Sequence, residues 1–419
     1  MKVLVLAAGR SKRIKPIEDK TLLKFNSKSL IRHCLDNLSR AGVTDFVVMT
    51  GKHNREAIIA ETTQVPYQVQ VLEQENLDEG MAGAIKSAAN SLKGESVLIV
   101  SSNDVVEQNL LDKFVERIAT DNPEALIVGK TVKEYFPGGY LKLDRDGFVQ
   151  TIVEKPGEGN EPSDLINLVF HYFKNADQLV AEVQATKSSK DDIYEVALQS
   201  LINKDVKIKV YPYNGEWFAI KYPWHVLQVA RYMHSKIKGQ GISPKAHIHG
   251  TAVISGEVVI EEGAKIDANA VIKGPAYIGK NTIVGVNSFV RDSYINDNCV
   301  IGFNSEITRT YMHDHVWTHN NYVGDSIIGS NVSFGGGSVT GNLRLDEKNV
   351  VADQPKLGLI TGNDIRVGIN TSFMPGVTIG SNSMIGAGLI LAEEVPPNSF
   401  VKMKSKLIIQ PNTKQVPKR

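Results

Sequence analysis

Two short stretches of the chain combine residue types that suit the binding of a small charged ligand. Residues 9–13 read Gly-Arg-Ser-Lys-Arg and follow directly on an apolar run, and Asp104 follows a second apolar run. Both runs are typical of strands buried on both faces of a sheet. Ligands of parallel sheets bind outside the carboxyl ends of the strands, where both stretches fall. We therefore expect a ligand site at this edge, and its glycine and basic residues suit phosphate.

Three histidines, His313, His315 and His319, lie close together in the second half of the chain. A His-x-His pair is able to bind zinc, but no cysteine and no third ligand at a suitable spacing accompanies this one. We therefore expect His313 and His315 to be structural.

Alternating strands and helices position the residues of the first half. The apolar positions of residues 30–38 mark one face of a helix that ends at Gly42. The alternation predicts an α/β fold, with a mostly parallel, Rossmann-like sheet covered by helices on both sides. The predicted strands are residues 3–8, 45–49 and 96–100, and the second predicted helix is residues 81–92.

A six-residue period dominates the second half. From Ile248 to Val290 an aliphatic residue recurs at every sixth position without exception, and a small residue or Val stands two places before each. Such a period is typical of the hexapeptide β-helix, in which stacked turns bury a shared core. Residues 341–356 are charged and break the period, so we expect a loop there. The aliphatic positions are Ile248, Ile254, Ile260, Ile266, Ile272, Ile278, Val284 and Val290, and the period resumes at Ile295, Ile301, Ile307, Ile328, Phe334, Val367, Phe373, Ile379, Ile385 and Leu391.

The length of 419 residues indicates more than one domain. We predict an α/β domain over residues 1–231 and a β-helix over residues 246–395. Glycines and a proline between them indicate a linker at residues 232–245. The polar, basic tail of residues 396–419 is interpreted as a solvated extension or an oligomer contact.

The charge balance argues against two classes of partner, and the cysteine content indicates the compartment. Lys and Arg number 47 against 46 Asp and Glu, which leaves a net charge of +1 and argues against nucleic acid or a membrane as partners. Cys34 and Cys299 lie in different halves and form no disulfide framework, as expected of an intracellular protein. The first apolar run is too short for a signal peptide or a membrane span. We predict a cytoplasmic protein.

The opening motif of the chain matches that of one enzyme family. Residues 6–14 read LAAGRSKRI and are followed by Pro16 and Lys20. They resemble the Leu-x-Ala-Gly-x-Gly-Thr-Arg-Met motif, with its later Pro and Lys, of the sugar-1-phosphate nucleotidylyltransferases. In that family a sugar-phosphate oxygen attacks the α-phosphorus of a nucleoside triphosphate, and pyrophosphate leaves. The resemblance implies nucleotide contacts at Ala8 and Gly9 and catalytic roles for Arg13 and Lys20, which offset charge on the transferring group.

Further motifs of the first half extend the resemblance. It implies that Gln74 and Gly80 contact a pyrimidine, uracil or thymine, and that Asp104 binds Mg²⁺. The family's second magnesium ligand is the Asp of Trp-x-Asp-x-Gly, but residues 217–221 read WFAIK and place Ala219 there. Contacts to the sugar phosphate are implied for Gly139, Glu154, Lys155 and Asn167.

The second half contains a motif of the acetyltransferase that accompanies this activity in the bifunctional N-acetylglucosamine-1-phosphate uridylyltransferases. Residues 319–325 read HNNYVGD and resemble its His-x-x-Tyr-x-Gly-Asp. The resemblance implies that His319 is the general base for attack of the amine of glucosamine-1-phosphate on acetyl-CoA, a role that suits the pKa of histidine. It also implies site roles for Tyr322, Asn342 and Lys348. A left-handed β-helix and a homotrimer assembled through it are implied as well.

Three functions remain open from the sequence. The first is a nucleotidylyltransferase acting on a sugar-1-phosphate with UTP or dTTP, with a glucosamine-1-phosphate N-acetyltransferase in the β-helix. The second is an acetyltransferase whose first domain only binds a ligand, and the third is a non-catalytic regulatory paralogue. Ala219, Ser11 and Asn103 depart from the family motifs and argue against the first. His319 and the complete set of sugar-side residues argue against the third, and we expect the first.

Overall fold

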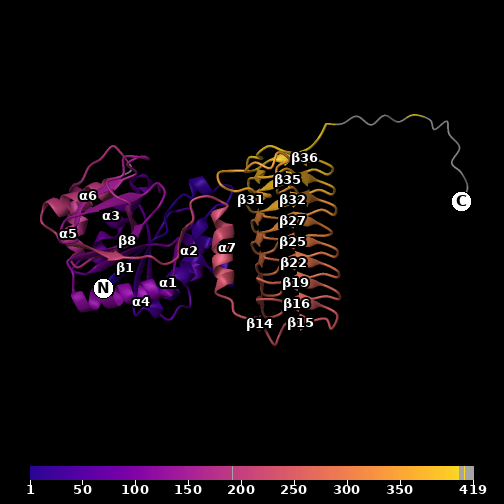
Figure 1. Cartoon of the computed structure of the whole chain (residues 1–419), viewed down its shortest axis with the longest axis horizontal. Helices are drawn as coiled ribbons and strands as arrows, with labels where there is room; N and C mark the ends of the chain where they lie inside the picture. The colour runs from indigo at the N-terminus through magenta and orange to yellow at the C-terminus, as the bar shows by residue number, and fades with distance from the viewer. Residues whose placement is uncertain (191, 405–409, 411–419) are drawn as a thin grey trace, which may run out of the picture.

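A computed structural model describes residues 1–190, 192–404 and 410 of the chain. Figure 1 shows a sheet-and-helix half beside an upright coil of short strands. Most of the predicted tail, residues 396–419, lies outside the described residues. Among the described residues, none of the helices is both long and apolar enough to span a membrane.

The first half is built on a nine-stranded sheet. Strand β1 (Lys2–Leu6) pairs in parallel with both β4 and β6, and β4 pairs in parallel with β5. Strand β11 runs antiparallel to β6, β8 and β9, and β10 runs antiparallel to β9. The sheet is therefore mixed, but its other strands all run in one direction, as the predicted mostly parallel sheet requires. The other strands are β4 (Asp45–Thr50), β5 (Gln68–Glu73), β6 (Val97–Ser101), β8 (Ala125–Thr131), β9 (Gly139–Leu143), β10 (Val149–Glu154), β11 (Leu165–Phe173) and β12 (Ile208–Pro212).

Helices cover both faces of this sheet, which confirms the predicted α/β class. The alternating side chains of β1 separate two cores: Val3 and Val5 pack with α1, α2 and α4, whereas Leu4 packs with α3, α5 and α6. The helices are α1 (Leu30–Arg40), α2 (Arg55–Thr62), α3 (Gly80–Leu92), α4 (Gln108–Asp121), α5 (Ala176–Ala185), α6 (Ile193–Asn203) and α7 (His225–Ser235). Short 3₁₀ turns lie at Lys12–Ile14, Lys20–Leu22 and Leu77–Glu79, and two-stranded pairs are formed by β2 (Lys24–Phe25) with β3 (Lys28–Ser29) and by β7 (Asp104–Val106) with β13 (Trp217–Ala219).

The second half is a parallel coil with three sides. One side stacks β14 (Gln240–Ile242), β17 (Val258–Ile260), β20 (Ala276–Ile278), β23 (Tyr294–Ile295), β26 (Tyr311–Met312), β28 (Ile327–Ile328), β31 (Ile360–Thr361) and β34 (Thr378–Ile379). A second stacks β16 (Val253–Ser255), β19 (Val271–Lys273), β22 (Phe289–Arg291), β25 (Glu306–Thr308), β27 (Tyr322–Gly324), β30 (Val339–Thr340), β33 (Ser372–Phe373) and β36 (Ile390–Leu391). The third stacks β15 (His247–Ile248), β18 (Lys265–Ile266), β21 (Ile283–Val284), β24 (Val300–Ile301), β29 (Val332–Phe334), β32 (Ile365–Val367), β35 (Ser383–Ile385) and β37 (Phe400–Val401), with Trp317 bridging β24 to β29.

The six-residue period is the core of the coil, as predicted. Every predicted aliphatic position from Ile260 onward is buried in one continuous cluster, and Ile248 and Ile254 pack against it on the first turns. Asparagines with positive φ, such as Asn281, Asn298 and Asn304, recur along the coil. Asparagine adopts this left-handed conformation more readily than other side chains, so these positions suit sharp bends of the chain. The predicted loop leaves the coil between β30 and β31.

The predicted linker, residues 232–245, contains the end of a helix and the first strand of the coil. Helix α7 continues to Ser235, and β14 already pairs with β17 of the coil. The helix extends because Tyr232 packs on Phe218 and His234 stacks on Tyr294 of the coil, with ring centroids 4.9 and 5.0 Å apart. In Figure 1, α7 stands upright between the two halves.

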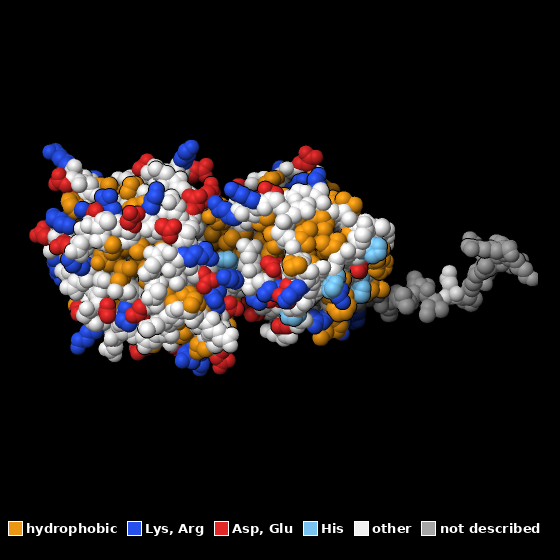
Figure 2. All heavy atoms as spheres, turned by 90° about the horizontal axis from the view of Figure 1, so that it is seen from below, with side chains coloured by type: hydrophobic (Ala, Val, Ile, Leu, Met, Phe, Trp, Pro, Cys, Tyr) orange, Lys and Arg blue, Asp and Glu red, His pale blue; other side chains and the backbone are white. Residues whose placement is uncertain are grey.

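Charges of both signs are interspersed over the face of the molecule shown in Figure 2. The first turn of the coil is seen end on there, and hydrophobic side chains gather on it. Ile242 and Val253 are 37% and 53% exposed at this end.

Candidate functional site

A cavity of about 270 Å³ lies at the edge of the sheet where the sequence predicts the ligand site. It is lined by residues that are distant in sequence, namely Arg13, Asp104, Gly139, Glu154, Lys155, Asn167, Ala219 and Lys221. The structure thus brings the predicted metal ligand and the predicted sugar-phosphate contacts into one cavity.

A second cavity, of about 480 Å³, adjoins the first and shares Arg13 and Lys221 with it. Gly9, Lys20 and Gly80 also line this cavity. Arg13 and Lys221 therefore lie between a space lined by the predicted nucleotide contacts and a space lined by the predicted sugar contacts. Ala8 is buried at the end of β1, directly before Gly9.

Local packing fixes two of the predicted contact residues. A Cβ atom on Gly139 would lie 2.6 Å from Asn167 Oδ1, so β9 approaches Asn167 closely only because residue 139 is glycine. The buried Gln74 side chain donates through Nε2 to the carbonyl oxygens of Asn76 and Gly80, each at 2.8 Å. Gln74 thereby holds the turn that contains Gly80.

The charges at the cavity perturb one another. Desolvation raises the pKa of the Asp104 carboxyl to about 6, and Lys20 and Lys221 act in the opposite direction. Desolvation also lowers the pKa of Lys20, and it lowers the pKa of Lys221 to about 8 with help from Arg13. Arg13, Lys20 and Lys221 therefore place positive charge near the Asp104 carboxyl, and such charge suits the binding of phosphate groups.

The strand partner of Asp104 is Ala219, the residue that replaces the family's second magnesium ligand. Its methyl group is unable to ligate a metal, and the described residues contain no cluster of three or more His, Cys, Asp or Glu that could hold one. The residues present therefore do not fit a magnesium ion held by two protein carboxylates. Of this strand pair, Asp104 is the residue whose carboxylate could contact the metal.

Lys221 lies two residues beyond Ala219, and its side chain is fixed at the cavity wall. Its Nζ atom donates to the Pro137 carbonyl oxygen at 2.8 Å and lies 3.4 Å from the centroid of the Phe136 ring. A cation over an aromatic face is held electrostatically. No motif in the sequence indicated this role for Phe136 and Pro137, because it depends on contact with Lys221. Pro137 and Lys221 are 84 positions apart in the sequence.

The second predicted site lies on the coil, on and after β27. Asn342 Nδ2 donates to Tyr322 Oη at 3.2 Å and also to Asp325 Oδ2. Asp325 is buried and receives two hydrogen bonds from Arg309, at 2.6 and 2.7 Å. The structure thus joins Tyr322 to Asn342 and adds Arg309, which the sequence analysis missed. The signal available in the sequence was the separation of 16 residues between Arg309 and Asp325, which is about one turn of the coil.

His319 is exposed on the turn before β27, beside Gly336. Lys348 lies in the exposed loop between β30 and β31, and among the described residues no hydrogen bond or ion pair joins its side chain to Tyr322 or Asn342. His313 accepts a hydrogen bond at Nδ1 from the backbone of Asp314, and burial lowers its pKa. His315 occupies a bend with positive φ. These placements agree with the structural roles expected for His313 and His315.

Comparison with known proteins supports both halves. Residues 2–220 match the nucleotidyl transferase family, and residues 257–292 match the bacterial transferase hexapeptide family. The bifunctional protein GlmU of Methanocaldococcus jannaschii is 31% identical over 434 residues, covering 98% of this chain and 99% of that protein. A bifunctional sugar-1-phosphate nucleotidylyltransferase/acetyltransferase of Sulfurisphaera tokodaii is 30% identical, covering 96% of this chain and 100% of that protein.

Among solved structures, an apo-UDP-glucose pyrophosphorylase aligns with a TM-score of 0.49 at 17% identity and covers 56% of this chain and 98% of that one. The family match and the two full-length relatives identify the group. The chain belongs to the nucleotidyl transferase family and, over nearly its whole length, to the bifunctional sugar-1-phosphate nucleotidylyltransferase/acetyltransferases.

Proposed function

We propose that the two adjoining cavities of the first half transfer a nucleotidyl group from UTP or dTTP to a sugar-1-phosphate. The observation that supports this best is the shared wall: Arg13 and Lys221 line both cavities, between the predicted nucleotide and sugar contacts. During transfer, the α-phosphorus of the nucleotide must lie close to both reactants, which places it where the two cavities meet. Positive charge there stabilises the negative charge on the oxygens of the transferring group.

In the proposed step, an oxygen of the sugar-1-phosphate attacks the α-phosphorus of the nucleotide. A bond forms between that oxygen and the phosphorus, the bond from the α-phosphorus to the bridging oxygen breaks, and pyrophosphate leaves. Arg13, Lys20 and Lys221 would offset the negative charge on the oxygens of the transferring group. Lys155 and Asn167, which also line the first cavity, would hold the sugar phosphate.

Magnesium is the metal that the family implies, and the pair of β7 with β13 offers it the carboxylate of Asp104. We infer that Mg²⁺ enters as part of its nucleotide complex, as substrate, with Asp104 as the single protein ligand. Mg²⁺ is commonly bound by one or two carboxylates together with substrate phosphates. The fixed ammonium of Lys221 supplies positive charge beside the position where the second ligand is missing.

For the coil we propose acetyl transfer from acetyl-CoA to the amine of glucosamine-1-phosphate. His319 would accept the amine proton as the nitrogen attacks the thioester carbonyl and CoA leaves as the thiol. Tyr322 and Asn342 would contact the sugar or the acyl group, and Arg309 and Asp325 hold Asn342 in place. Lys348 would contact this site only if the loop between β30 and β31 carried it there.

We further propose that the two activities belong to residues 1–231 and 246–395, and that the coil forms a homotrimer in the cytoplasm. Apolar side chains on the outside of the coil support an interface between copies: Phe303 and Trp317 are each 54% exposed. A neighbouring coil would cover such side chains, since large apolar patches on a surface favour association.

Pyrophosphate release together with acetyl transfer tests this assignment. Asp104→Ala is expected to abolish pyrophosphate release and leave acetyl transfer intact, and His319→Ala to do the reverse. Asp146→Asn, an exposed carboxylate in a turn, serves as the control for Asp104. Loss of both activities from either variant in folded protein would refute the two-site assignment.

A further inference from the structure

The hairpin β2–β3 joins the first half to the coil. It follows the Lys20 turn after a single residue, Leu23, and its turn residues Asn26 and Ser27 have φ of 51° and 55°. Two consecutive positive φ angles are typical of a tight, rigid hairpin turn. The hairpin is therefore joined to the Lys20 turn by a short connection.

Three tyrosines on successive turns of the coil receive this hairpin. Tyr277, Tyr294 and Tyr311 point outward from β20, β23 and β26, yet each is fully buried. The Phe25 ring packs against the rings of Tyr294 and Tyr311, with centroids 5.4 and 5.3 Å away. Outward positions of such a coil normally meet solvent, so these tyrosines form a dedicated docking column for the hairpin.

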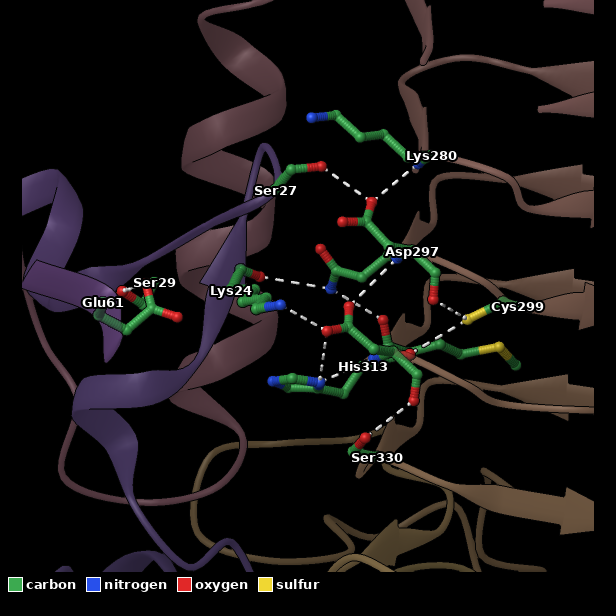
Figure 3. Close-up of polar contacts among 12 residues, drawn as sticks. Lys24, Ser27, Ser29, Glu61, Lys280, Asp297, Cys299, His313 and Ser330 are labelled. Atoms are coloured by element: carbon green, nitrogen blue, oxygen red, sulfur yellow. Dashed lines mark hydrogen bonds and ion pairs between the residues drawn. The ribbon is translucent and has the colours of Figure 1, made fainter. Parts of the chain in front are cut away.

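Polar contacts fix the register of the docked hairpin, as Figure 3 shows. Lys24 Nζ binds Asp314 Oδ2 at 2.6 Å, and Ser27 Oγ donates to Asp297 Oδ1 at 2.8 Å. The side chain of Asp314 is only 11% exposed and that of Lys24 26%. Charge-assisted bonds in a partly desolvated place are stronger than exposed ion pairs.

The other flank of the Lys20 segment also contacts the coil. Glu18 accepts a hydrogen bond from Asn363 Nδ2 at 3.2 Å, and a Cβ atom on Gly362 would lie 3.1 Å from the Pro16 carbonyl oxygen. Lys20 therefore lies between two segments that are both held by the coil. Within the first half, its backbone N–H donates to Ser11 Oγ at 3.3 Å and its Nζ to the Ile220 carbonyl oxygen at 3.4 Å. These are long hydrogen bonds.

We propose that the coil positions the phosphate-binding segment, residues 9–23, and that Lys24 is the positioning residue through which Asp314 does so. The coil then has a role in nucleotidyl transfer beyond its own acetyl transfer. The activity part of this inference rests on the proposed nucleotidyl transfer, whereas the structural part does not.

The test uses the full-length variants Lys24→Gln, Asp314→Asn, the double variant and the charge-exchanged pair Lys24→Asp/Asp314→Lys. Lys28→Gln is the matched control, because Lys28 lies on the same hairpin but pairs with Asp36 of the first half. Hydrogen–deuterium exchange of residues 9–23, the KM for UTP and kcat are measured for each. Acetyl transfer reports on the coil itself.

Each single variant is expected to speed exchange in residues 9–23 and to raise the KM for UTP about tenfold, which corresponds to about 1.4 kcal/mol. The double variant should be no worse than either single one, because both remove the same contact. The charge-exchanged pair should regain part of the loss, and Lys28→Gln should match the wild type.

Unchanged exchange and KM in both single variants, or equal effects in Lys28→Gln, would overturn the inference. Should the wild type release no pyrophosphate, the proposed nucleotidyl transfer fails, and exchange in residues 9–23 decides the positioning role alone. Should the single variants lose acetyl transfer and unfold at lower denaturant concentration throughout, the contact is merely structural and the inference is wrong.

Discussion

Replacing Lys221 with methionine removes a fixed positive charge from the boundary between the two cavities. Two unit charges about 4 Å apart interact by about 4 kcal/mol at the effective dielectric typical of a protein surface. Removing one donor from a site that stabilises a transition state commonly lowers kcat by about 10²–10³. Because Arg13 and Lys20 remain, we expect Lys221→Met to lower kcat for pyrophosphate release about 100-fold.

The pH profile distinguishes a charge effect from lost packing. The pKa of Asp104 is about 6 and that of Lys221 about 8, so kcat/KM should fall below about pH 6, where Asp104 gains a proton, and above about pH 8, where Lys221 loses one. Lys221→Arg keeps its charge at high pH, and its alkaline limb should move upward. Lys221→Met should lose that limb.

Steady-state pyrophosphate release between pH 5 and 10 measures both effects, with acetyl transfer in the same protein as the control for folding. Methionine matches the length of the lysine stem but lacks the ammonium that lies over the Phe136 ring. Wild-type kcat in Lys221→Met, with the alkaline limb unchanged, would refute the role assigned to Lys221.

Three further predictions concern the metal, the coil and acid stability. Ala219→Asp places a second carboxylate opposite Asp104, and should tighten Mg²⁺ binding in a calorimetric titration, while Ala219→Asn, which lacks the charge, should tighten it less. Ile301→Ala removes a fully buried side chain from the coil core and should lower the free energy of unfolding by about 2–5 kcal/mol in denaturant titrations, whereas the outward Val300→Ala should cost less. Burial lowers the pKa of His234 to about 4 in the folded state, against about 6.5 in the unfolded state. The contribution of neutral His234 to the free energy of unfolding is therefore complete above pH 6.5 and falls by up to about 3 kcal/mol as the pH drops to 4. His234→Phe keeps the ring on Tyr294 and should flatten that loss in urea unfolding at pH 7 and pH 5; an equally steep loss would contradict it.

Much of the fold could be predicted because its determinants are local. One inward aliphatic residue per side of the coil produces the six-residue period, so positions such as Ile272 and Ile301 could be assigned to the core from spacing alone. The buried strands β1 and β6 were equally visible as apolar runs. Strand β11 was not assigned, and its antiparallel pairing with β6 is what makes the sheet mixed.

The contacts between the halves could not be predicted, because they join residues far apart in sequence. The glycines and proline near residue 240 indicated a linker that begins at residue 232. In the structure, α7 continues to Ser235 because His234 is buried against Tyr294 of the coil. Tyr277, Tyr294 and Tyr311 recur at 17-residue intervals, a signal of one coil face. Only the structure shows that Phe25 packs on Tyr294 and Tyr311 and that Ser27 contacts Tyr277.

The candidate site was predicted in part. Motif order indicated Asp104, Lys155 and Asn167 and the missing carboxylate at Ala219, and the structure places all four around one cavity. Arg309 carried no motif, since its role follows from stacking one turn below Asp325.

The central claim is tested most directly by pyrophosphate release from the purified full-length protein. The assay supplies Mg²⁺, UTP or dTTP, and either N-acetylglucosamine-1-phosphate or glucose-1-phosphate, with Asp104→Ala as the matched variant. Release by the wild type and its loss in Asp104→Ala would support transfer with Asp104 as the single carboxylate at the metal. Absence of release across all substrate pairs, in protein that is folded and still transfers acetyl groups, would contradict the account and leave the coil as the sole enzymatic half.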